Sequence, residues 1–354
     1  MLILRELLEL LVKRGGSDLH ITAGSPPKLR LNGALLDTEF EALTSDDTKS
    51  IVYGVLSSEQ IARFERELEL DISFGIPGFG RFRTNVFIQR GAIGAVLRVV
   101  PERIRSFTDL GLPRETCEEL CRLPRGLVLV TGSTGSGKST TLAAMVDFLN
   151  TTRQSHIVTI EDPIEFVHKH KKSLVNQREV GPDTHEFKRA LRAALRQDPD
   201  VVLVGEMRDL DTIEAALNIS ETGHLTFSTL HTSDAVQTIS RIIDVFPGGQ
   251  QQQIRTQLAS TLSGVFCQQL VPMSNGRGRA LACEILLCTP AVRALIREDK
   301  AHQIYSIIQT SRRQGMRTMN QSLADLYRAN QISYEEALSH STAPSELARL
   351  IRST

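Results

Sequence analysis

The first hundred residues combine two kinds of hydrophobic spacing. Residues 2–13 carry leucines and a valine at helical intervals, which makes one face of a helix apolar. Further along, apolar and polar residues alternate, and Asn32-Gly33 has the composition of a tight hairpin turn. The predicted strands cover residues 17–21, 28–31, 81–87 and 94–100, with a helical stretch near 44–68. Residues 1–100 are therefore predicted to form a small α+β domain with an antiparallel sheet.

A different pattern begins after residues 101–115, where Pro and Gly interrupt the periodicity and predict a linker. In residues 116–354, continuous apolar segments alternate with amphipathic helical ones. This alternation is typical of a mostly parallel sheet with helices on both faces. The expected strands are 126–130, 156–160, 201–204 and 225–229, and the expected helices are 138–150 and 184–196. The last hundred residues are expected to be mainly helical.

Composition argues against several classes of protein but does not identify a reaction. The 354 residues include 41 Lys+Arg and 41 Asp+Glu, so the net charge of zero offers no general attraction for a nucleic acid. Five cysteines without a C-x-x-C pair favour reduced thiols over a zinc site or a disulfide framework. No apolar run approaches the roughly 18 residues that a membrane span needs, which favours a cytoplasmic protein.

One glycine-rich segment carries the strongest chemical signal. It follows the predicted strand 126–130, opens the predicted helix 138–150 and matches the pattern G-x-x-x-x-G-K-[ST] of a phosphate-binding loop. Glycines let the backbone N–H groups point inward at phosphate oxygens, Lys138 supplies charge, and Ser139 offers a hydroxyl to Mg²⁺. The predicted binding residues for a nucleoside triphosphate are Ser133, Thr134, Gly135, Ser136, Gly137, Lys138, Ser139 and Thr140.

Carboxylates follow two other predicted strands. Glu161, Asp162 and Glu165 come after strand 156–160, and Glu206 comes two residues after strand 201–204. Ligand sites of α/β sheets lie at the carboxyl ends of strands, so these acids are candidates for binding metal and activating water. Gly205 occupies the position at which an Asp usually precedes this Glu, so Glu206 or Asp162 is expected to take the role on the metal side.

Two histidines flank the predicted strand 225–229. His224 precedes it and His231 follows it. Beside a nucleotide site, such histidines could contact the γ-phosphate or a neighbouring subunit. The spacing alone equally allows ordinary surface or core histidines.

Taken in order, four motifs resemble those of the type II/IV secretion ATPases: the phosphate-binding loop, Ile-Glu-Asp-Pro-Ile-Glu-Phe at 160–166, Val-Gly-Glu-Met-Arg-Asp at 204–209, and the segments around the two histidines. The chain is most similar to the PilT-like branch, which retracts type IV pili. Residues 270–288 contain only Cys283 and Cys288, whereas the extension and secretion branch usually has a four-cysteine zinc subdomain. Residues 291–298 also resemble the branch signature AIRNLIRE, with departures at Val292 and Ala294.

The resemblance implies roles for particular residues. The small domain is expected to be PAS-like, and the second a RecA-like P-loop ATPase domain with a helical C-terminal part. Glu165 is then the glutamate that orients the attacking water, Glu206 the Walker B glutamate, and His224 and His231 the His-box residues. Arg83 and Arg98 match arginines that approach nucleotide phosphates, although strand arginines alone usually cover an exposed sheet face.

At the level of the whole protein, the resemblance implies a hexameric ATP-driven motor for pilus retraction in twitching motility. The alternatives are a pilus-assembly or type II secretion ATPase, and a non-hydrolysing accessory subunit of the retraction motor. Expected partners are five further copies, an inner-membrane pilus platform protein and a second retraction ATPase, without nucleic acid. Such a motor is expected at the cytoplasmic face of the inner membrane, with nucleotide-dependent rotation between its two domains.

Overall fold

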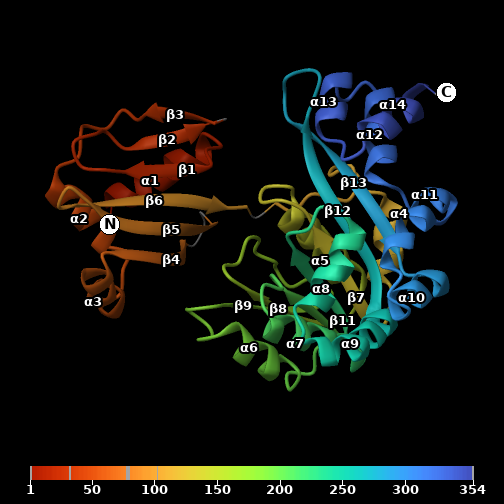
Figure 1. The fold of residues 1–354 in the computed structure, drawn as a ribbon. Coiled ribbons are helices and arrows are strands. Elements are labelled where there is room, and N and C mark those ends of the chain that lie inside the picture. Colours follow the sequence, from red (N-terminus) through yellow and green to blue (C-terminus); the bar gives the residue numbers. More distant parts are fainter. Residues whose placement is uncertain (1, 32, 77–79, 102, 353–354) are drawn as a thin grey trace. The chain divides into compact units, whose positions relative to one another are not determined.

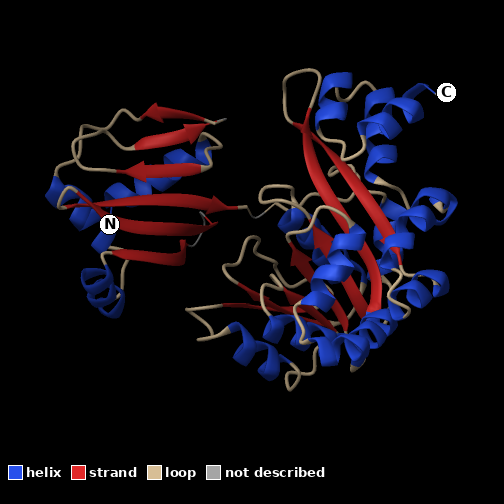
Figure 2. Ribbon diagram, in the orientation of Figure 1, coloured by secondary structure: helices blue, strands red, loops and turns tan. Residues whose placement is uncertain are grey.

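The computed structural model describes residues 2–31, 33–76, 80–101 and 103–352. The chain divides into two compact units, which we call the N-terminal unit (Met1–Arg103) and the second unit (Ile104–Thr354). Figure 1 labels their elements and Figure 2 separates helices from strands. Within the described ranges, no helix has both the length and the apolar character needed to cross a membrane.

The N-terminal unit is built on a six-stranded sheet in the order β3-β2-β1-β6-β5-β4, and its neighbouring strands are antiparallel. The predicted antiparallel α+β fold is thus confirmed. Asn32 lies outside the described residues, but the strands on either side pair as expected, with Leu31 opposite Ala34. The elements are α1 (Leu2–Lys13), β1 (Asp18–Ile21), β2 (Lys28–Leu31), β3 (Ala34–Asp37), α2 (Ser45–Tyr53), α3 (Ser58–Glu67), β4 (Glu69–Ile76), β5 (Gly80–Gln89) and β6 (Ala92–Val100).

Capping explains where the helices of this unit begin. The helical stretch expected near 44–68 is two helices, because Thr44 and Ser57 each form a capping box with the residue three positions later. In α1 the apolar stripe is buried from Leu4 to Leu11, whereas Val12 is 41% exposed. The stripe therefore ends one residue earlier than the sequence pattern predicts.

The segment predicted as a linker contributes to the core of the second unit. Phe107 and Leu112 are buried there, packed with residues of β7, α4 and α5. Helix α4 already begins at Arg114. Apolar burial therefore assigns residues 104–115 to the second unit and shortens the predicted linker of 101–115 to the residues before Ile104.

The second unit contains a seven-stranded sheet in the order β13-β12-β7-β11-β10-β8-β9. Its strand pairs are parallel except for the antiparallel pair β12–β13. Its strands are β7 (Gly126–Thr131), β8 (His156–Glu161), β9 (Leu174–Glu179), β10 (Val201–Val204), β11 (Leu225–Leu230), β12 (Leu262–Pro272) and β13 (Arg279–Leu287). Its helices are α4 (Arg114–Cys121), α5 (Lys138–Thr152), α6 (Phe187–Ala194), α7 (Leu210–Glu221), α8 (Ala235–Asp244), α9 (Gly248–Thr261), α10 (Pro290–Arg297), η1 (Ala301–Gln303), α11 (Ile304–Thr310), η2 (Arg312–Gln314), α12 (Met319–Arg328), α13 (Tyr334–Ser339) and α14 (Pro344–Arg352).

Helices cover both faces of this sheet, as predicted. Alternate residues of the central strand β7 enter different apolar clusters: Leu127 and Leu129 pack with α6 to α9, and Val128 and Val130 pack with α4 and α5. A strand buried on both faces has no polar face to show in the sequence. This explains why the central strands were predictable as continuous apolar runs.

The C-terminal hundred residues are mainly helical, as predicted, but they also contain a long hairpin formed by β12 and β13 that the sequence pattern did not indicate. Both strands are buried along most of their length, so their sequence lacks the alternation that marks a half-exposed strand. Helices α12, α13 and α14 pack against the part of the hairpin around Val271 and Ala282. Figure 1 shows these helices beside the distal end of the hairpin.

Candidate nucleotide site

Four parallel strands bring most of the site residues predicted in the second unit to one edge of the sheet. The pairs Thr131–Leu230, Ser228–Val204 and Val204–Ile160 show that β7, β11, β10 and β8 reach this edge together. Neighbouring strands are about 4.8 Å apart, so β10 lies about 10 Å and β8 about 14 Å from β7. The glycine-rich loop, His231, Glu206 and the acidic loop 162–165 thus follow one another across the edge in that order.

Backbone geometry explains the glycines of the loop between β7 and α5. Gly132 has a φ of 140°, and a Cβ there would lie 2.4 Å from the backbone oxygen of Gln268 and 2.6 Å from Ser136 Oγ. Gly137, with a φ of 94°, is the N-cap of α5. Both positions therefore need glycine, one for lack of space and both for a positive φ.

The loop has the features of an anion cradle. Helix α5 spans 15 residues and begins directly after the loop, so the positive end of its dipole faces the same region. Ser136 Oγ is buried and has no hydrogen-bond partner among the described residues. A phosphate oxygen satisfies such a hydroxyl, and this is the observation on which the fit of a phosphate depends.

Lys138 lies over the loop. Its Nζ donates to the carbonyl oxygens of Gly132 at 2.9 Å and Ser133 at 3.0 Å. Burial lowers the pKa of Lys138, and the nearby Glu206 carboxylate partly opposes this effect. Ser139 follows in the first turn of α5 with an exposed side chain. Hydroxyl and carboxylate oxygens are the donors that Mg²⁺ prefers, so Ser139 with Glu206 or Asp162 fits this ion.

Glu206 is the centre of a small charged cluster. Its Oε1 lies 2.9 Å from Arg208 Nε and 3.1 Å from His231 Nε2, with 23% of the glutamate side chain exposed. Arg208 is an ion-pair partner of Glu206, the neighbouring acid, and Glu206 raises the pKa of this arginine. The structure therefore brings Glu206 and His231 together.

Two carboxylates hold the acidic loop that contains Asp162 and Glu165. Glu161 accepts hydrogen bonds from Thr159 Oγ1 at 2.7 Å and from the Glu165 N–H at 3.4 Å. Glu179 on β9 accepts from the Ile164 N–H at 3.1 Å. Burial raises the pKa of Glu161, which suits a structural role better than water activation at the surface. Glu165 is half-buried on the loop that these two acids anchor.

His224 lies at the opposite edge of the sheet from His231. The adjoining Leu225 pairs with Gly126, at the start of β7, and not with the end that carries the phosphate-binding loop. His224 Nδ1 lies 3.0 Å from the carbonyl oxygen of Ile219 and 3.2 Å from Thr222 Oγ1, at the C-terminal end of α7. Within one chain the strand β11 therefore separates the two predicted His-box residues.

Arg83 and Arg98 face each other on adjacent strands of the N-terminal unit. Arg98 Nε donates to Asp18 Oδ1 at 2.7 Å, and the Asp18 side chain is only 4% exposed while that of Arg98 is 65% exposed. The buried carboxylate thus holds the guanidinium at its Nε atom. Arg98 is an ion-paired strand arginine with most of its side chain exposed.

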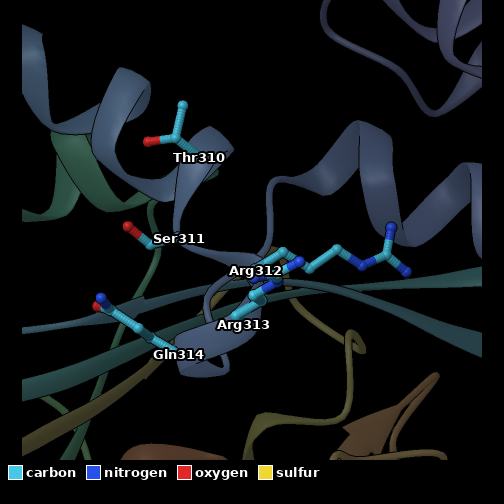
Figure 3. Close-up of a pocket in the computed structure, with 5 residues that line it drawn as sticks. All are labelled: Thr310, Ser311, Arg312, Arg313 and Gln314. Carbon is cyan, nitrogen blue, oxygen red and sulfur yellow. The ribbon is translucent and has the colours of Figure 1, made fainter.

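A surface hollow elsewhere in the second unit includes none of the predicted site residues. It has a volume of about 760 Å³ and is lined by residues 310–314, which connect α11 to α12 (Figure 3). Arg312 in this hollow pairs with Asp325. The hollow is thus a feature of the C-terminal helices.

One contributor to the site was missed in the sequence. Gln268 lies on β12, where its backbone oxygen faces Gly132 and its buried side chain exchanges hydrogen bonds with Thr141 of α5 at 2.8 and 3.2 Å. These contacts fix both ends of the phosphate-binding loop against a neighbouring strand. A glutamine within an apolar run was the only available sign.

Known proteins resemble the chain over most of its length. The family model described as "Type II/IV secretion system protein" matches residues 79–339. The "Type IV pilus retractation ATPase PilT" of Pseudomonas aeruginosa is 49% identical, covering 96% of this chain and 98% of that protein. The "Twitching motility protein" of Neisseria gonorrhoeae is 47% identical, with 88% and 83% covered.

The fold agrees with a solved relative as well. The crystal structure of "the Pilus Retraction Motor PilT and Bound ADP" superposes with a TM-score of 0.91 at 51% identity, covering 97% of this chain and 98% of that one. The expected fold class, an α+β domain followed by a P-loop ATPase domain, is confirmed by this match together with the two sheets described above. The chain therefore belongs to the type II/IV secretion family and is an ATPase of the PilT-like kind.

Proposed function

We propose that this chain forms a ring-shaped ATP-hydrolysing motor that retracts type IV pili from the cytoplasmic face of the inner membrane. The observation that carries the proposal is the 49% identity, over 96% of the chain, with a protein described as a type IV pilus retraction ATPase. The site supports it because its loop, lysine and acids lie at one edge of the sheet.

At the site, the residues of the loop would bind the β- and γ-phosphates of ATP. Lys138 Nζ would exchange the carbonyl oxygens of Gly132 and Ser133 for phosphate oxygens, where its charge offsets that of the departing γ-phosphoryl group. Mg²⁺, when bound, adds Lewis-acid charge beside the same oxygens. Ser139 would hold it directly, with Glu206 or Asp162 as the acid on the same side.

Water activation is assigned to Glu165, on the loop anchored by Glu161 and Glu179. Its carboxylate would orient water for in-line attack, since phosphoryl transfer depends mainly on positioning and electrostatics. Glu206 and His231 would keep each other in place beside it. We further propose that Arg83 and Arg98 supply positive charge to a nucleotide in the ring, and that hydrolysis drives rotation between domains.

Retraction is tested in cells from which the gene has been deleted. Accumulated surface pili that no longer shorten, with shortening restored by the wild-type gene but not by the Lys138→Ala variant, support the proposal. Cells without pili would instead indicate an assembly ATPase. We propose a pilus platform protein and a second retraction ATPase as partners. If neither co-purifies with the chain from cells that make pili, this part of the proposal is wrong.

Two biochemical measurements test the motor itself. Phosphate release by the purified wild-type chain separates a hydrolysing motor from a non-hydrolysing accessory subunit. A hexamer of 39.2 kDa subunits should elute near 235 kDa in the presence of ATP and Mg²⁺. A strict monomer under these conditions contradicts the ring.

A further inference from the structure

Glu284, on β13, is a buried carboxylate with no part in the mechanism above. Its side chain is almost inaccessible, since the residue is 3% exposed. It accepts a hydrogen bond from the Ala235 N–H at 2.9 Å and another from the Met319 N–H. These are the first residues of α8 and α12, so one carboxylate binds the N-terminal ends of two helices.

No Lys or Arg forms an ion pair with Glu284 within the described part of the chain, and Asp234 is an acidic neighbour. Burial consequently raises the pKa of Glu284 to about 7. A buried carboxylate is costly unless its oxygen atoms are hydrogen-bonded, and here two backbone N–H groups provide those bonds. An apolar side chain would fill the same space without the free-energy cost of burying a carboxylate, so packing alone does not explain a glutamate here.

One of the two helices leads directly to the nucleotide site. Only residues 231–234 separate the end of β11 from the start of α8. Within this segment, Asp234 caps α8 and Thr232 Oγ1 lies 2.7 Å from Thr238 Oγ1 on that helix. His231, at the start of the segment, lies 3.1 Å from Glu206. The position of α8 therefore determines where His231 meets Glu206.

The other helix leads away from the site. Helix α12 packs on β13 and belongs to the apolar cluster of the C-terminal helices, which includes Leu323 and Leu347. The Glu284 carboxylate therefore contacts both the first residue of α8, which follows the segment carrying His231, and the first residue of α12.

We infer that Glu284 is a positioning residue that holds the start of α8, and through it the His231–Glu206 contact, while tying that contact to the C-terminal helices. The inference rests on the proposed role of Glu206 and His231 in ATP hydrolysis. It does not depend on whether the motor retracts or extends a pilus.

Protonation of Glu284 is the natural probe, because a protonated carboxyl group carries an O–H donor and accepts hydrogen bonds from backbone N–H groups more weakly than a carboxylate does. The charged and titratable groups that face it are Asp234 on α8, Cys267 on β12, Cys283 on its own strand and Tyr305 on α11. Burial raises the pKa values of both cysteines and of Tyr305. These three groups therefore stay uncharged near neutral pH.

The experiment compares wild type with Glu284→Gln in the full-length chain, measuring phosphate release and thermal unfolding from about pH 6 to 8.5. Glutamine mimics the protonated form, so the two proteins should turn over ATP similarly at the acidic end. Above pH 7 the wild-type kcat should exceed that of the variant by about tenfold, the rate equivalent of one lost hydrogen bond, with little change in KM.

Stability should move in the opposite direction. The folded-state pKa of Glu284, about 7, lies above the 4.5 of an ordinary glutamate, so the folded chain binds more protons and loses stability as pH rises between these values. Glutamine lacks this loss, so the Tm of the variant relative to wild type should increase with pH. A merely structural role predicts that activity and Tm fall together at every pH, and that result would overturn the inference.

Two further variants keep the test decisive. Ala235→Pro removes the N–H that donates to Glu284 and adds ring carbons in its place, at a first helical position that accepts proline and after an extended Asp234. It should therefore lower kcat even if Glu284→Gln does not fold. Glu346→Gln is the matched control, because Glu346 accepts hydrogen bonds from Tyr305 and Gln309 within the C-terminal helices without touching α8. Equal kcat losses in Glu346→Gln and Glu284→Gln, or wild-type kcat in Ala235→Pro, would contradict the inference.

Discussion

Gly132 offers a direct test of how tightly the phosphate-binding loop is packed. In Gly132→Ala the new methyl group would lie 2.4 Å from the backbone oxygen of Gln268, closer than the 3.0 Å below which real Cβ contacts essentially never occur. Ser136 Oγ, at 2.6 Å, can rotate away, but the strand backbone cannot. The φ of 140° adds backbone strain, because L-residues rarely adopt it.

The expected cost follows from these two terms. Overpacking a well-packed site costs about 1–3 kcal/mol, and strain at a disfavoured φ costs about 1–3 kcal/mol. We therefore expect Gly132→Ala to lower the free energy of unfolding by about 4 kcal/mol. Gly135→Ala is the control: its φ is 80° and no atom lies within 4 Å of the added Cβ. Strain alone should cost the control about 1 kcal/mol.

Urea denaturation followed by circular dichroism measures the difference between the two variants, provided that the slopes of the transitions agree. The expected gap of about 3 kcal/mol corresponds to a Tm difference of about 6–12 °C in a unit of this size. Binding of a fluorescent ATP analogue should weaken at least tenfold in Gly132→Ala, about 1.4 kcal/mol, because the loop must shift to admit the methyl group. Equal stability of the two variants would refute the packing argument.

Other residues of the site give further expected outcomes. Glu165→Gln should bind ATP normally and lower phosphate release by at least about 100-fold, as expected for loss of a group that positions water; retained turnover would transfer the role to Glu161 or Glu206. His231→Ala should lower kcat because it removes the contact with Glu206 Oε1, while His224→Ala should cost about 1 kcal/mol of stability through lost hydrogen bonds at the end of α7. Equal effects of the two histidine variants on kcat in a monomeric preparation would contradict this separation.

Most elements around the site could be predicted, because they are buried strands or a helix that follows a recognisable motif. Strands β7, β8 and β10 are buried on both faces and are mostly apolar in sequence, and β11 is buried although it also contains Thr and Ser. Helix α5 begins where the glycine-rich motif predicts it. The hairpin of β12 and β13 was missed for the related reason that a buried strand and a buried helix segment look alike in sequence. Strand β9 was missed because four of its six residues, Asn176 to Glu179, are polar.

Local chemistry is what the sequence determined by itself. The spacing of glycines with Lys138 and Ser139 specifies a loop that wraps phosphate, and the acids at strand ends identify where water and metal chemistry takes place. These features depend on neighbours within a few residues. They can therefore be recognised without knowledge of the fold.

Only the tertiary structure decided which distant residues meet. Sheet order placed His231 beside Glu206 and His224 at the opposite edge, and it set Gln268 against Gly132 and Glu284 against the start of α8. Each contact joins residues whose separation along the chain carries no information about their separation in space. The pairing of strands supplies that information, because register fixes which side chains share an edge.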